Sequence, residues 1–366
     1  MSARPLRPGL SRRAFGATVA TATFALIAAC GSDSDDSGST GAGSGEGTAA
    51  GSDAFPVSIE HKFGTAEIPA KPTKVVVVGL VEQDALLALG TVPIATTKWF
   101  GENEGAIWPW AKDKLGSGAV PELLDSTDGI QFEKIAALQP DLIVGMYSGV
   151  TQEDYDKLAQ IAPTVLAPKD TNDYAVAWDV ITPTIGRALG LEAEAQKLVD
   201  EVNARFETAR ADNPGFAGQT ALMATLYEGY YVYAEEDPRG QFLKSLGFSL
   251  PDGLAEAVGE EFGASISKER IDLLDTDALV WLVPDPVKDK AGLEADGLYN
   301  KLAVNTEGRA VYLSDGTEGG APLSDLGAAT SFVTVLSLPF LIENLVPLIA
   351  QAADGDPATA VEDESA

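Results

Sequence analysis

Two glutamates, Glu133 and Glu269, occupy the same place in two copies of one sequence pattern. The first copy, Phe132–Gly145, combines apolar residues at helical spacing, a proline and a short apolar strand. The second copy, Lys268–Leu282, follows the same course at one constant offset. A carboxylate in this place can pair with a cationic partner, and it also stabilises its own helix through the helix dipole. The repeat predicts two lobes of similar construction, each with a glutamate at the start of the same helix.

The scarcity of certain side chains excludes several kinds of chemistry. The chain has one Cys, one His and three Met, so we expect no internal disulfide and no zinc, manganese or copper site. No G-x-S-x-G, P-loop or G-x-G-x-x-G motif follows a predicted strand, and His61 lies far from a serine nucleophile motif. We therefore expect a protein that is not an enzyme, with a carboxylate-dependent enzyme as the alternative. The net charge of −30 argues against nucleic acid as a partner.

The elements around the repeat indicate an α/β fold. Val75–Val78 is an unbroken β-branched run, which is typical of a parallel strand buried on both faces. Helix Glu82–Leu89 follows it, and Tyr147 comes just after the strand of the first copy. In open α/β sheets ligands bind beyond the carboxyl ends of the strands. A long amphipathic segment between the two copies is expected to connect the lobes, with an ordinary surface helix as the alternative.

The N-terminal segment is predicted to be an export signal and a lipid anchor. Arg12 and Arg13 precede a short run of apolar and small residues, Ala14–Ala29, and Cys30 follows in a lipobox-like setting. Either the twin-arginine or the Sec route is open, and Cys30 is the predicted lipidation site. The predicted segments are a signal peptide at 1–29, a lipidated Cys and flexible tether at 30–54, an N-terminal lobe at 55–180, a connecting helix at 181–213, a C-terminal lobe at 214–352 and a disordered acidic tail at 353–366.

Three stretches together resemble the periplasmic-binding proteins that serve iron–siderophore ABC importers: Glu60–Gly90, Phe132–Gly145 and Ile266–Leu282. The resemblance implies two Rossmann-like lobes joined by a single long helix, with the ligand cleft between the lobes. It also implies a membrane permease and a cytoplasmic ATPase as partners, with Glu133 and Glu269 docking onto permease arginines. A monomer held at the membrane only by its lipid is expected. Cobalamin and haem receptors share the fold and remain alternatives.

The ligand that this resemblance implies is a ferric siderophore, whose iron is already fully coordinated, so the protein needs no cofactor or metal ligands of its own. Flat apolar walls and a few donors would hold such a chelate. Arg239 is the best charged donor, unless it pairs with a neighbouring acid such as Asp237. Few basic residues are available for an anionic catecholate, which favours a hydroxamate. The predicted ligand-binding residues are Trp99, Phe100, Trp108, Tyr147, Tyr227, Tyr230, Arg239 and Trp281.

Overall fold

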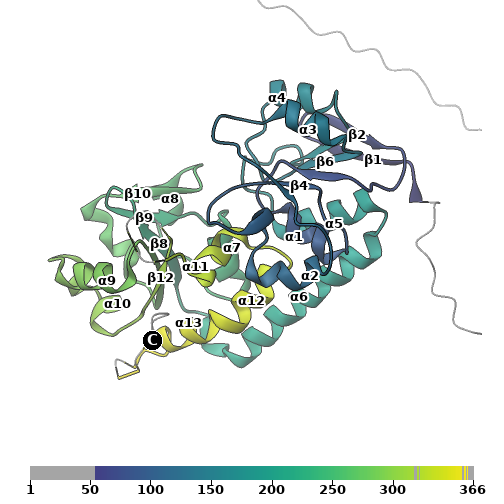
Figure 1. Ribbon diagram of the computed structural model, residues 1–366. Helices are drawn as coiled ribbons and strands as arrows, with labels where there is room; N and C mark the ends of the chain where they lie inside the picture. Colours follow the sequence, from purple (N-terminus) through teal and green to yellow (C-terminus); the bar gives the residue numbers. More distant parts are fainter. Residues whose placement is uncertain (1–53, 317–319, 321, 357, 360, 362–366) are drawn as a thin grey trace, which may run out of the picture. The chain divides into compact units, whose positions relative to one another are not determined.

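Two five-stranded sheets form the frame of the protein (Figure 1). A short antiparallel hairpin, β1 (Val57–His61) with β2 (Gly64–Ile68), precedes the first sheet. Residues 1–53, which include the predicted signal, Cys30 and nearly all of the tether, lie outside the described residues. The structure is a computed structural model that describes residues 54–316, 320, 322–356, 358–359 and 361.

The first-lobe sheet has the order β5-β4-β3-β6-β7, with every neighbouring pair parallel. Val75 and Val77 of the central strand enter one apolar core and Val76 enters another, which explains the unbroken run of valines. The strands are β3 (Val75–Val77), β4 (Ala95–Thr97), β5 (Glu122–Leu124), β6 (Leu142–Gly145) and β7 (Thr164–Leu166), and the helices are α1 (Glu82–Ala88), α2 (Lys112–Leu115), α3 (Phe132–Leu138) and α4 (Gln152–Leu158).

The second-lobe sheet has the order β10-β9-β8-β11-β12, which repeats the first arrangement strand for strand. Its β8, β11 and β12 are parallel, but β9 runs antiparallel to both of its neighbours. The strands are β8 (Ala221–Leu226), β9 (Tyr230–Tyr233), β10 (Gly263–Ile266), β11 (Ala278–Val283) and β12 (Ala310–Ser314), and the helices are α7 (Pro238–Ser245), α8 (Leu254–Val258), α9 (Pro286–Ala295) and α10 (Ala303–Thr306).

Aspartates of the internal repeat make the same contacts in both lobes. The carboxylate of Asp141 accepts hydrogen bonds from the backbone N–H and the hydroxyl of Thr73, both at 2.8 Å. Asp277 accepts the same two bonds from Thr220, at 2.8 and 3.0 Å. Each bond ties the start of one central strand to the strand beside it. The copies differ in their helices, because Lys268–Leu274 is a 3₁₀ segment with a non-helical residue where α3 is a regular α-helix.

The predicted connector at 181–213 contains two helices, α5 (Trp178–Leu189) and α6 (Glu192–Asp212). Gly190 separates them, because it adopts the left-handed conformation (φ 67°) and caps the end of α5. The two helices then pack closely: a Cβ at Gly186 would lie 2.3 Å from the Cβ of Ala195. The long helix of the connector is therefore α6 alone.

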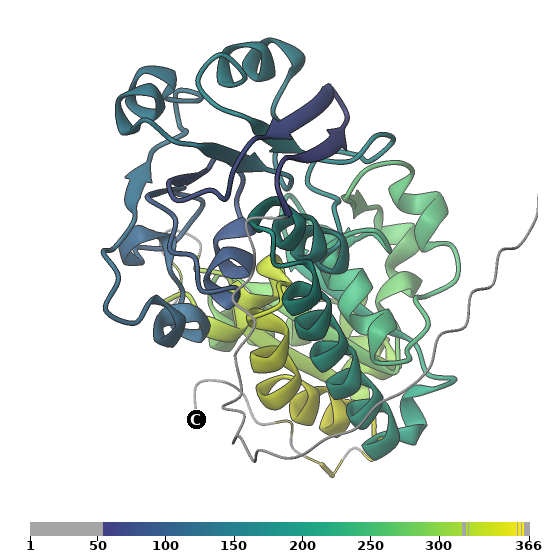
Figure 2. The same cartoon turned by 90° about the vertical axis from the view of Figure 1, so that its right-hand side faces the viewer.

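The apolar region at 331–349 spans parts of three short helices. These are α11 (Asp325–Phe332), α12 (Ser337–Asn344) and α13 (Val346–Ala352). Helix α12 lies alongside α6, as Figure 2 shows, and also packs on the 3₁₀ turn Pro109–Ala111 of the first lobe. Within the described part of the chain, no helix has both the length and the apolar character needed to span a membrane. Beyond α13, the predicted tail contains Val361, which packs half-buried against the main core.

Candidate ligand-binding site

Six aromatic side chains form one cluster beyond the carboxyl ends of the first-lobe strands. We call this the aromatic cluster. Trp99 and Phe100 follow β4, and Tyr147 follows β6. Trp99 and Phe100 are half-buried, whereas Tyr147 is 5% exposed. Four of the predicted ligand residues thus lie together. The cluster consists of Trp99, Phe100, Trp108, Trp110, Tyr147 and Phe332.

Phe332, at the end of α11, is the centre of the aromatic cluster. Its ring centroid lies 5.2 Å from that of Trp99, 5.7 Å from Phe100, 5.3 Å from Trp108 and 5.4 Å from Trp110. These separations are typical of favourable aromatic pairs. Phe332 could not be predicted from the sequence, because it lies in an apolar run that has no feature to distinguish it from ordinary core. Trp110 could have been found from the sequence, because Trp99, Trp108 and Trp110 lie close together in the chain.

Arg239, in the first turn of α7 in the second lobe, lies beside the aromatic cluster, because it bonds to Ser331, the residue before Phe332. Its guanidinium donates to the carboxylate of Asp237 at 3.0 Å and to the hydroxyl of Ser331 at 2.6 Å. It also lies 4.0 Å from the ring centroid of Tyr233. The pairing with Asp237 is the alternative that the sequence left open. The positive charge of Arg239 is therefore balanced by Asp237 within the protein.

The phenol of Tyr147, in the aromatic cluster, is affected by charged groups of the second lobe. Burial raises the pKa of its phenol, and the negative charge of Asp237 raises it further, partly against the charge of Arg239. These three groups come from different lobes. Charged groups of the second lobe therefore act on the first-lobe side of the aromatic cluster.

The other predicted residues of the second lobe lie elsewhere. Trp281 is fully buried and donates its indole N–H to the hydroxyl of Tyr299 at 3.0 Å. Tyr230 is 8% exposed and packs against both of these rings. Because these side chains fill the second-lobe core, we leave Trp281 and Tyr230 out of the site. Tyr227 is 64% exposed in the turn between β8 and β9, and its role in ligand binding stays a prediction.

A cavity of about 620 Å³ opens between the lobes beside the aromatic cluster. We call it the cleft cavity. The ring of Tyr174, which lines it, lies 5.8 Å from that of Tyr147 and so joins the cavity to the cluster. The loop that carries Tyr174 could not be predicted as part of the site, because its sequence has no regular pattern. The cavity is lined by Asn172, Asp173, Tyr174, Ala175, Glu236, Asp237, Gly259, Glu260, Glu261 and Phe262.

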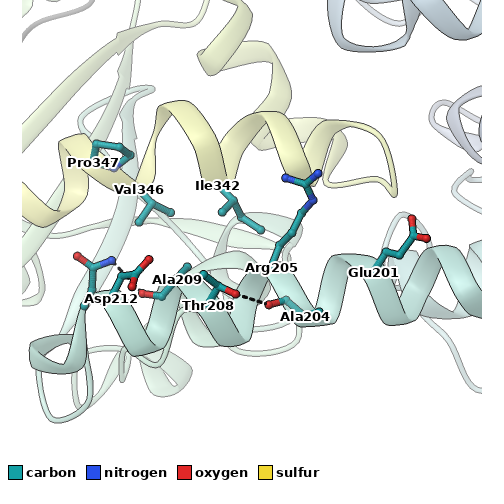
Figure 3. Close-up of a pocket in the computed structure, with 10 residues that line it drawn as sticks. Glu201, Ala204, Arg205, Thr208, Ala209, Asp212, Ile342, Val346 and Pro347 are labelled. Carbon is teal, nitrogen blue, oxygen red and sulfur yellow. Dashed lines mark hydrogen bonds between the residues drawn. The ribbon is translucent and has the colours of Figure 1, made fainter.

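A second hollow, of about 750 Å³, lies between α6 and the helices α12 and α13 (Figure 3). Arg205 and Thr208 come from α6, and Ile342 and Val346 face them from the C-terminal helices. None of the predicted ligand residues lines it. It is therefore separate from the candidate site.

Two buried carboxylates of α1 hold the candidate site in place. Glu82 accepts the backbone N–H of Tyr147 at 2.6 Å, and burial raises its pKa against the lowering effect of such bonds. Asp84 accepts the indole N–H of Trp110 at 2.8 Å and the hydroxyl of Thr334, and burial raises its pKa to about 6. Thr334 lies two residues after Phe332, so Asp84 joins both sides of the aromatic cluster. No sequence signal distinguishes these acids from surface residues.

The remaining sequence predictions concern residues outside the cleft. Glu133 and Glu269 are both exposed in the first turns of α3 and of the 3₁₀ segment, so their docking role stays a prediction.

His61 is fully buried and packs edge-on against Tyr155 at 4.9 Å, which is a structural role. Burial lowers the pKa of His61. Among the described residues, no group of three or more His, Cys, Asp or Glu is arranged to hold a metal ion.

The fold and the cleft between lobes are those of a known class of binding protein. The model of the periplasmic binding protein family matches residues 75–319, and the chain belongs to this family. A periplasmic solute binding protein from Mycobacterium smegmatis is 35% identical, with a TM-score of 0.70, covering 81% of this chain and 98% of that one.

Two relatives from Bacillus subtilis are named for what they bind. The probable siderophore-binding lipoprotein YfiY is 29% identical over 235 residues, which cover 61% of this chain and 68% of the relative. The iron(3+)-hydroxamate-binding protein YxeB is 28% identical over 202 residues, which cover 53% of this chain and 57% of the relative. The chain thus matches little more than half of the length of YxeB.

Proposed function

We propose that this protein captures a ferric siderophore in the cleft between its lobes and delivers it to an ABC importer. The aromatic cluster carries this proposal. Its half-buried rings, Trp99 and Phe100, offer apolar surface, and the cleft cavity beside it is lined by both lobes. Large ligands are held by such walls together with a few polar groups. The names of the relatives support iron chelates as the ligand class.

The charges of the site favour a hydroxamate over a catecholate. The only arginine among the residues placed in the site, Arg239, already pairs with Asp237. Among the described residues that line the cleft cavity, five are acids and none is a lysine or arginine. A triply anionic ferric catecholate would need several cations to replace its hydration. A neutral or cationic ferric hydroxamate has no such need.

Delivery requires a partner and a position at the membrane. Glu133 and Glu269 occupy equivalent exposed places in the two lobes, which suits a permease made of two related halves. Charge pairs of this kind set the orientation of a complex and the rate at which it forms. We place the protein outside the cytoplasmic membrane as a monomer held by a lipid on Cys30, with a binding role in place of a catalytic one.

Titration of the purified protein with ferrioxamine, haem and cobalamin, followed by tryptophan fluorescence, tests the proposal. Ferrioxamine should quench the fluorescence saturably, because the coloured chelate would lie against Trp99. The Trp99→Ala variant should lose about 1–3 kcal/mol of binding free energy, the value of one buried aromatic contact. Trp281→Phe is the matched control, since it also removes one tryptophan but lies in the second-lobe core. Binding of haem or cobalamin without ferrioxamine would refute the proposal.

A further inference from the structure

Residues 331–334 cover the end of α11 and the turn before α12, and hydrogen bonds fix them to both lobes. On the second-lobe side, the hydroxyl of Ser331 accepts a hydrogen bond from Arg239 of α7 at 2.6 Å. On the first-lobe side, the hydroxyl of Thr334 donates to the carboxylate of Asp84 in α1, which is fully buried. The backbone between these two bonds is therefore held at both ends.

Val333, which lies between the two bonds, has a backbone conformation that valine rarely adopts. Its φ is 41°, in the left-handed region that favours glycine, and its side chain is buried. Of the six non-glycine residues with positive φ in the described part of the chain, it alone is β-branched. Such strain persists only where the surrounding contacts determine the backbone, and it is concentrated at functional sites. The turn thus keeps its shape because its neighbours hold it.

Phe332, directly before this turn, supports the rings that a ligand would touch. These rings are the half-buried Trp99 and Phe100, which we call the ligand wall. The ring of Phe332 is only 2% exposed and lies behind the wall, 5.2 Å from Trp99 and 5.7 Å from Phe100. Trp110 packs on Phe332 at 5.4 Å and donates its indole N–H to Asp84 at 2.8 Å. The carboxylate that holds the turn therefore also holds a ring of the same cluster.

We propose that Thr334 and Asp84 are positioning residues for ligand binding. Their hydrogen bond holds the strained turn at Val333, and the turn holds the Phe332 ring behind the ligand wall. Without this bond the turn relaxes toward an ordinary backbone conformation, and the wall loses its fixed shape. A wall that is already ordered binds more tightly, because less has to be ordered on binding. This inference rests on the proposed function and adds residues that act on the chelate without touching it.

Thr334→Val tests the inference, because valine has the shape of threonine but lacks the hydroxyl. It should weaken the binding of ferrioxamine, followed by tryptophan fluorescence, about tenfold, which is part of the contribution of one buried aromatic ring. Thr334→Ser restores the hydroxyl and should recover most of that affinity. In the Trp99→Ala background the effect of Thr334→Val should shrink, because part of the wall through which it acts is gone. An effect of the same size in both backgrounds would overturn the inference.

Thr220→Val is the matched control. The hydroxyl of Thr220 donates to Asp277 at 3.0 Å and accepts a backbone N–H at 3.2 Å. That of Thr334 likewise donates to Asp84 and accepts the backbone N–H of Ser337 at 3.0 Å. Thr220, however, lies at the amino end of the second-lobe strands, so the control variant should change the affinity for ferrioxamine less than about twofold. Equal losses of affinity in the two valine variants would show a general structural effect and overturn the inference.

The near-UV circular dichroism of the ligand-free protein separates this inference from the proposed function. The signal depends on rigid packing of aromatic rings, and Trp108 and Trp110 are stacked 5.2 Å apart against Phe332. Thr334→Val should change this spectrum and Thr220→Val should not. An unchanged spectrum in Thr334→Val would overturn the inference, whatever the protein binds. Failure of the unaltered protein to bind ferrioxamine would instead overturn the hydroxamate assignment, and the spectrum would then decide the positioning role.

Discussion

Replacing Asp84 with asparagine should change how the stability of the protein depends on pH. Burial raises the pKa of Asp84 from 3.8 to about 6, so the folded state binds its proton more tightly than the unfolded state does. The stabilisation from this proton is fully present below pH 3.8 and is lost as the pH rises to about 6. Between pH 4 and pH 8 the loss amounts to about 2–3 kcal/mol. Asparagine does not titrate, so the Asp84→Asn variant should not show this loss of stability.

The geometry around Asp84 makes asparagine a suitable replacement. Both donors, Trp110 Nε1 and Thr334 Oγ1, reach the same oxygen, Oδ2, while Oδ1 is buried without a partner. The carbonyl oxygen of asparagine can keep both bonds, and its amide takes the place of Oδ1. Any constant cost of that exchange shifts stability equally at every pH.

Urea denaturation of both proteins at pH 4 and pH 8 measures the effect. The stability of Asp84→Asn relative to the unaltered protein should rise by about 2–3 kcal/mol from the lower to the higher pH. Other titrating groups cancel in this difference. Asp84→Ala leaves the buried indole N–H of Trp110 without an acceptor, whereas the Thr334 hydroxyl can still donate to Ser337, and the variant should be less stable than Asp84→Asn by a constant of about 1–3 kcal/mol. A relative stability that is the same at pH 4 and pH 8 would show that burial does not shift the pKa of Asp84.

Three further predictions follow from the placement of other residues. Trp281→Ala should lower the free energy of unfolding by about 3–5 kcal/mol because it opens a cavity beside Tyr299, and thermal melting would show it. Glu133→Ala with Glu269→Ala should abolish uptake of the iron chelate in cells while the affinity for the chelate stays the same; a parallel loss of affinity would return both residues to a structural role. Cys30→Ala should move the protein from the membrane fraction to the soluble one, and unchanged fractionation with no lipid mass on the cysteine would contradict the anchor.

The two lobes could be predicted from the sequence because each lobe needs the same contacts between its central strands, and the same residues therefore recur in both copies of the repeat. Asp141 and Asp277 each fasten two neighbouring strands, and a carboxylate facing a backbone N–H and a hydroxyl leaves little freedom of residue type. The break at Gly190 within the connector was missed, although a glycine in a helical pattern is a possible cap. Helical periodicity continues on both sides of it and conceals the turn.

The site was only partly predictable, because half of it comes from segments that are distant in sequence. Trp99 and Tyr147 could be found from their places after strands, where ligands bind in such sheets. Phe332 reaches the cluster only through the path of the C-terminal helices, which no local pattern determines. Trp281 follows the same rule as Tyr147 in being aromatic near a strand end, yet its side chain is on the core face. Alternation along a strand that is buried on both faces does not reveal which core a side chain enters.

The position of Phe332 has a consequence for the order in which the protein forms during synthesis. Trp108 and Trp110 belong to the first lobe, but they pack against Phe332 and, for Trp110, against Phe340. These rings leave the ribosome only after both sheets have been made, because translation proceeds from the N-terminus. Until then these tryptophans have each other and Phe100 but lack the rings of the C-terminal helices, and exposed apolar rings of this kind favour aggregation. The first lobe is synthesised first and completed last.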